Sequence, residues 1–62
     1  MELNLNIKLD NAAFEGEYAR DLEIERLLIH VAGQIIAGYA SRAIIDSNGN
    51  KVGKWEIERE AA

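Results

Sequence analysis

The side chains with the clearest chemical potential are the oxygen-bearing residues of the segment 46–50, DSNGN. Carboxylate and amide oxygens at alternate positions are typical calcium ligands, so this spacing invites comparison with an EF-hand loop. An EF-hand loop needs glycine at its sixth position and glutamate at its twelfth, but counting from Asp46 places Lys51 and Ile57 there. We therefore predict a hairpin turn instead, because Asn48-Gly49 between two strand-like runs is a strong hairpin signal and both residues accept positive φ.

His30, the single histidine, is the other residue with catalytic or metal-binding potential. It shares the polar sector of a predicted helix with Glu23 and Arg26, and the chain has no cysteine or second histidine to complete a metal site. The sequence therefore favours a solvated histidine beside an exposed Glu23–Arg26 pair. If the protein does bind a partner or ligand through charge, the candidate contacts are Arg26, His30 and Arg42.

No pattern in the chain indicates an enzyme. There is no phosphate-binding glycine loop, no nucleophile elbow and no pair of carboxylates in a recognisable catalytic context. A chain of 62 residues makes one domain, here residues 1–62, with little room for a closed pocket. We expect no catalytic residues, no metal site and no cofactor.

Charge and hydropathy exclude further classes of partner. The net charge is −4 and the seven basic residues form no run, which argues against a nucleic-acid-binding protein. No apolar run approaches the length of a membrane span, and Met1-Glu2 does not begin a signal peptide. We expect a protein of the cytoplasm.

Four segments carry the periodicity of regular structure. Residues 2–9 alternate strictly between apolar and polar side chains, as a half-buried strand does, and residues 18–38 have the length and spacing of an amphipathic helix. Residues 39–46 and 51–59 predict a second and a third strand. The fold class is therefore α+β, a three-stranded sheet of order β-α-β-β with the helix on one face. A helix between the first two strands permits a parallel crossover, which makes an antiparallel meander less favoured.

Local features refine this outline. In the connection 10–17, residues 12–14 predict a short turn whose Phe14 closes one end of the core. Val52 is out of phase with the alternation of the last strand, and Gly53 predicts a β-bulge that restores it. Trp55 is either the main aromatic of the core or an exposed anchor for a partner.

The helix has more apolar surface than one sheet can cover. One face holds Ile24, Leu27, Leu28, Val31 and Ile35, and a second stripe lies well away from it. We predict a homodimer in which this second stripe packs on its symmetry mate, with small residues allowing close approach; an exposed, neutral Gly33 is the alternative. The predicted dimer interface consists of Tyr18, Leu22, Ile29, Ala32, Gly33 and Ile36.

The chain as a whole resembles the short uncharacterised proteins encoded by bacteriophages and prophages. The features that carry the resemblance are the first strand ending in LDNAAF, the amphipathic helix, and the closing DSNGNKVGKWEIE. The resemblance implies the βαββ fold and, by analogy with other small acidic phage proteins, the binding of a host protein.

Three functions follow as hypotheses. The first is a protein-interaction module that binds and inhibits a host protein, such as a component of a defence system, as a homodimer. The second is a binder or sponge for a small ligand at the dimer interface, near Arg26, His30 or Arg42. The third is a structural or regulatory accessory protein without a ligand.

Overall fold

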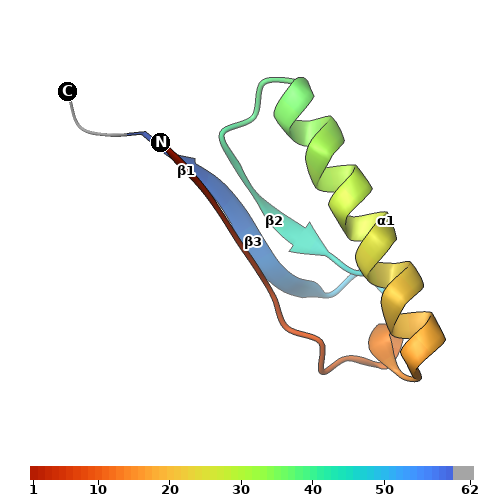
Figure 1. The fold of residues 1–62 in the computed structure, drawn as a ribbon. Helices are drawn as coiled ribbons and strands as arrows, with labels where there is room; N and C mark the ends of the chain where they lie inside the picture. Colours follow the sequence, from red (N-terminus) through yellow and green to blue (C-terminus); the bar gives the residue numbers. More distant parts are fainter. Residues whose placement is uncertain (60–62) are drawn as a thin grey trace.

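The computed structural model describes residues 1–59 as a small sheet with one long helix on one face (Figure 1). The α+β class and the β-α-β-β order are confirmed. The three strands are one to three residues shorter than the sequence predicts, and α1 begins one residue before the predicted range 18–38 and ends two residues before the end of that range. The elements are β1 (Glu2–Ile7), the 3-10 turn η1 (Ala12–Phe14), α1 (Glu17–Ile36), β2 (Ser41–Ile45) and β3 (Lys51–Glu58).

β3 is the central strand of the sheet. It pairs antiparallel with β1 on one side and with β2 on the other, so the strand order is β1-β3-β2. β1 and β2 therefore run in the same direction, as strands joined by a helical crossover do, but they do not pair with each other. The hairpin after β2 returns the chain into the gap between them, which leaves β1 and β2 as the two edges.

The sheet face toward α1 is apolar and the other is polar, as the alternation predicted. Leu5 of β1 lies opposite Trp55 of β3 in the antiparallel ladder, whereas Asn4 lies opposite Glu56 and Asn6 opposite Lys54. Trp55 is fully buried, which decides for the core position rather than an exposed anchor. The buried core consists of Phe14, Leu27, Val31, Ile44, Val52 and Trp55.

The predicted irregularity in β3 is present. The register shifts between Ile44 and Ile45, so that Val52 is the extra residue of a bulge and turns into the core. The neighbouring Gly53 lies against β1 so closely that a β-carbon built on it would be 1.8 Å from the carbonyl oxygen of Asn6. Glycine is required here by close approach of another backbone.

The hairpin turn differs from the prediction in one respect. Gly49 has a φ of 84°, but no residue other than glycine has a positive φ among those the structure describes, so Asn48 does not. The Asp46 carbonyl accepts a hydrogen bond from the Gly49 N–H at 3.0 Å, and the Asn50 carbonyl accepts one from the Asp46 N–H at 2.9 Å. The turn therefore has one left-handed residue, as longer hairpin loops do, rather than the two of a type I′ turn.

The helix α1 lies between the turn η1 and Gly38. The connection before it contains η1, whose Phe14 is buried and closes one end of the core as predicted. Neither Asp10 nor Asn11 caps that turn through its side chain; the Asn11 amide donates instead to the Asp46 carboxylate at 3.0 Å. α1 ends before Gly38, which has a φ of 103°.

Candidate functional site

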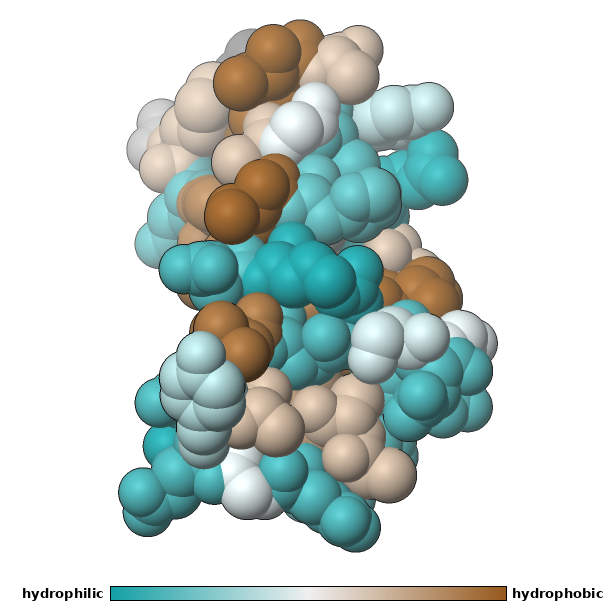
Figure 2. Space-filling view, turned by 90° about the vertical axis from the view of Figure 1, so that its right-hand side faces the viewer, coloured by the Kyte–Doolittle hydropathy of each residue, from teal (hydrophilic) through white to brown (hydrophobic). Residues whose placement is uncertain are grey.

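The second apolar stripe of α1 is exposed along the whole helix. Its four large residues, Tyr18, Leu22, Ile29 and Ile36, are between 47% and 87% exposed, and Leu22, Ile29 and Ile36 follow one another at intervals of seven residues. With Ala32 and Gly33 they form what we call the outer face of α1. Figure 2 views the molecule from the α1 side and shows apolar side chains in several groups, with polar side chains between them.

Part of this face carries only small residues. Ala32 and Gly33 lie between Ile29 and Ile36, and a β-carbon built on Gly33 would meet nothing within 4 Å. Within the described chain, Gly33 therefore has no packing role, although glycine in a helix costs about 1 kcal/mol relative to alanine. The space above it is open to another molecule.

The prediction that Leu28 lies on the sheet-facing side of the helix is wrong. Leu27 and Val31 are buried and Ile24 and Ile35 are half-buried, as predicted, but Leu28 is 45% exposed. The reason is that α1 is turned about its axis toward the side of Glu23 and Gln34, which lie roughly 100° or more from Leu28 on the helical wheel. Gln34 accepts a hydrogen bond from the Trp55 indole at 2.7 Å, which fixes this rotation.

Glu23 departs most clearly from the position that the sequence predicts. It was placed in a solvated polar sector, yet its exposed fraction is 7%. Arg26 donates to both of its carboxylate oxygens at 3.0 Å, and the Ser47 backbone N–H donates to one of them at 2.7 Å. The hydrogen bonds from Arg26 lower the pKa of Glu23 although its burial opposes this shift. The spacing of Glu23 and Arg26 predicts their pairing, but nothing in the sequence indicates the contact with Ser47.

Asp46 organises the loop that resembled a calcium site. Its exposed fraction is 4%, and one carboxylate oxygen accepts hydrogen bonds from the backbone N–H groups of Asn48 and Asn50 at 2.9 and 2.8 Å. The bond from Asn50 and the bond from the Asn11 amide help lower its pKa. The carboxylate oxygens of Asp46 thus accept hydrogen bonds from the loop and from Asn11, and no cluster of three or more possible metal ligands occurs in residues 1–59.

The three candidate polar contacts lie in different environments. His30 is exposed, as expected. Arg26 is held by Glu23, which raises the pKa of the Arg26 guanidinium, so this side chain is already engaged. Arg42, on β2, stacks on the Tyr39 ring with its guanidinium carbon 4.4 Å from the ring centre. The structure therefore does not single out one site shared by these three residues.

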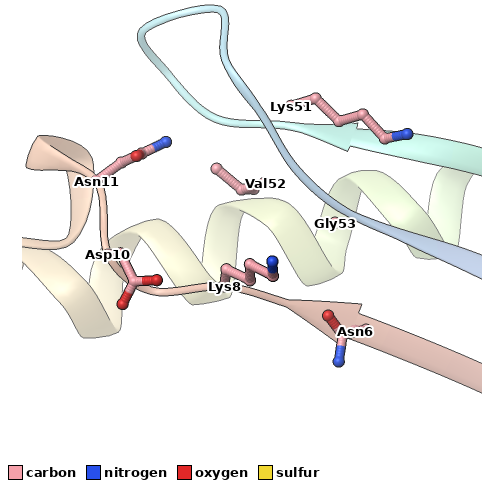
Figure 3. Close-up of a pocket in the computed structure, with 7 residues that line it drawn as sticks. All are labelled: Asn6, Lys8, Asp10, Asn11, Lys51, Val52 and Gly53. Carbon is pink, nitrogen blue, oxygen red and sulfur yellow. The ribbon is translucent and has the colours of Figure 1, made fainter.

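The hollows of the surface are shallow. A depression of about 270 Å³ lies between the end of β1 and the start of β3 (Figure 3). It is open to solvent, and its volume falls below the usual 300–1,000 Å³ of small-molecule sites. Its lining residues are Asn6, Lys8, Asp10, Asn11, Lys51, Val52 and Gly53.

Two further findings concern the chain as a whole rather than one site. In the part of the chain that the structure describes, no helix is both long and apolar enough to cross a bilayer. Comparison with protein-family models, with curated proteins and with solved structures gives no match to this chain. The resemblance to phage proteins therefore remains an expectation from sequence.

Proposed function

We propose that this protein is a small interaction module that binds another protein through the outer face of α1. The observation that carries the proposal is the exposure of four large apolar side chains on one side of a single helix. Helix faces of this type bind partners by placing residues of successive turns in an apolar groove. Each large side chain contributes roughly 1.5–3 kcal/mol when it is fully buried.

The resemblance to phage proteins supports a bacterial host protein as the partner, with inhibition of that protein as the consequence. The small residues Ala32 and Gly33 support a second copy of the chain on the same face, which is the homodimer that the sequence predicts. The two occupants use the same residues and would compete. Arg26, His30 and Arg42 remain candidates for polar contacts with a partner or ligand.

The test uses the full chain and the substitution Ile29→Glu. Ile29 is 66% exposed, so the charge should leave the fold intact and abolish binding through the outer face of α1. Ile45→Glu, at an exposed apolar residue of β2, is the matched control. Circular dichroism verifies folding of both variants.

Two readouts then separate the occupants. Light scattering over a dilution series measures self-association, and affinity capture from a bacterial host lysate, followed by rebinding of the purified partner, measures the host complex. We expect Ile29→Glu to abolish at least one of the two and Ile45→Glu to abolish neither. Equal binding by the native chain and Ile29→Glu in both assays would refute the outer face of α1 as the binding surface.

A further inference from the structure

The outer edge of β1 carries backbone groups that no strand of residues 1–59 pairs with. The Lys8 N–H donates to the Val52 carbonyl at 2.8 Å, and the Asn6 carbonyl points at Gly53, so even-numbered residues direct their backbone groups toward β3. Backbone direction alternates along a strand. The N–H and C=O groups of Leu3, Leu5 and Ile7 therefore point away from β3, along the open edge.

This edge lacks three of the features that usually prevent strand addition. Proteins protect open edges with proline, bulges or inward-pointing charges, and β1 has none of these. Its side chains toward the α1 side are Leu3, Leu5 and Ile7, of which Leu3 and Leu5 are 55% and 37% exposed. β1 thus has an unpaired edge next to an incompletely covered apolar face.

We propose that β1 pairs antiparallel with β1 of a second copy of the chain, about a two-fold axis at Leu5. In this register Leu5 lies opposite its own symmetry mate and Leu3 lies opposite Ile7 of the second copy. On the other face, Asn4 lies opposite Asn6 and Glu2 lies opposite Lys8. Every residue therefore meets one of matching chemistry, and the two symmetric Glu2–Lys8 pairs supply charge complementarity.

Other registers of the same strand are less favourable. Centring the axis on Asn6 places Glu2 opposite Asp10, which sets two negative charges against each other. Centring it on Asn4 leaves Lys8 beyond the end of the paired region. The register centred on Leu5 also uses the outward groups of Leu3, Leu5 and Ile7 on both copies, which gives about six backbone hydrogen bonds.

The other edge of the sheet does not offer the same match. β2 has five residues and a register shift at its end. Antiparallel self-pairing about its central residue, Ala43, would place the Arg42 guanidinium opposite the apolar Ile44. β1 is therefore the edge suited to a second copy.

The resulting dimer is a six-stranded sheet with both helices on the same face, because a two-fold axis between antiparallel strands is perpendicular to the sheet. It covers Leu3 and Leu5 and leaves the outer face of α1 accessible. The inference is thus independent of the proposed function, which concerns a different surface.

Charge exchange at the two ends of β1 tests the register. Glu2→Lys or Lys8→Glu alone places like charges opposite each other twice, whereas the double variant restores opposite charges. We expect each single variant to raise the dimer dissociation constant about tenfold and the double variant to return it to within about threefold of native. Sedimentation over a dilution series at low salt measures these constants, and Glu15→Lys controls for net charge.

Hydrogen exchange of the native chain provides a second readout. In the dimer the amide protons of Leu3, Leu5 and Ile7 are protected at high protein concentration and exchange fast on dilution, whereas that of Asn6 is protected at both. A native monomer at all concentrations, or single variants that dimerise like the native chain, would overturn the proposal. Dimerisation abolished by Ile29→Glu but unaffected by the charge exchange would assign the dimer to the outer face of α1 instead.

Discussion

At the scale of single residues, the two glycines within regular elements have opposite roles. Gly53 is required because the Asn6 carbonyl of β1 occupies the place of a β-carbon, whereas nothing lies within 4 Å of the same position at Gly33. Substitution of each glycine by alanine therefore distinguishes a glycine required by close approach of another backbone from one that only weakens a helix.

We expect Gly53→Ala to lower the free energy of unfolding by about 1–3 kcal/mol or more, because β1 must move away from β3. Gly33→Ala should raise it by about 1 kcal/mol, since alanine favours the helix. Urea unfolding of both variants at low protein concentration measures the changes. A harmless Gly53→Ala would show that β1 is not held as closely to β3 as the structure indicates.

Glu23 and Asp46 make the stability of the protein dependent on pH. Their pKa values in the folded state lie below the ordinary values of 4.5 and 3.8, so the folded state binds their protons more weakly than the unfolded chain does. Their stabilising contribution is complete above these ordinary values and is lost as the pH falls through the folded-state pKa values.

We therefore expect the free energy of unfolding to fall as the pH is lowered from about 5 toward 2. Glu23→Gln, which cannot ionise, should be less stable at neutral pH by about 1–3 kcal/mol and should show a shallower decline in acid. Asp21→Asn, at an exposed carboxylate that pairs with the neighbouring Arg20, is the matched control. A parallel decline of native and Glu23→Gln would remove Glu23 as a source of the pH dependence.

At the scale of elements, the rotation of α1 decides which apolar residues stabilise the monomer. Leu27 and Leu28 are adjacent in sequence and were assigned to one face, yet their exposed fractions are 1% and 45%. The Glu23–Ser47 and Gln34–Trp55 hydrogen bonds hold the helix in this orientation.

Leu27→Ala should accordingly cost about 2–5 kcal/mol of unfolding free energy, as buried leucines do, and Leu28→Ala clearly less than half of that. Chemical denaturation at a concentration where the chain is monomeric gives both values. Equal losses at the two positions would mean that α1 is centred on the sheet as the helical wheel alone predicts.

At the scale of the whole molecule, one short chain leaves two kinds of surface uncovered, the outer face of α1 and the edge of β1. A domain of 62 residues is near the lower limit for folding alone, and association is a common source of added stability. Binding of another molecule at either uncovered surface can therefore add to the stability of the folded chain.

If the chain associates through either surface, the melting temperature should rise with protein concentration, because mass action favours the folded oligomer. Calorimetry over a hundredfold range of concentration measures this rise. Glu2→Lys should reduce the slope if β1 is the interface, and Ile29→Glu should do so if the outer face of α1 is. A melting temperature independent of concentration in the native chain would indicate a monomer.

The pattern of residues along the chain predicts the elements and the two sides of the sheet. Strict alternation defined β1, the apolar periodicity defined α1, and the phase error at Val52 located the bulge beside Gly53. These features depend on residues close together in the chain, and local geometry decides them. The excess of apolar residues on α1 likewise follows from the pattern of residues along the chain.

The way in which these elements meet depends on contacts between residues far apart in the chain. Placing β3 between β1 and β2 depends on the hairpin returning across the sheet, and the burial of Glu23 depends on a backbone N–H 24 residues away. The rotation of α1, the exposure of Leu28 and the open edge of β1 follow from these long-range contacts. No sequence pattern specifies them, because each is the outcome of competition among several hydrogen bonds and apolar contacts made at once.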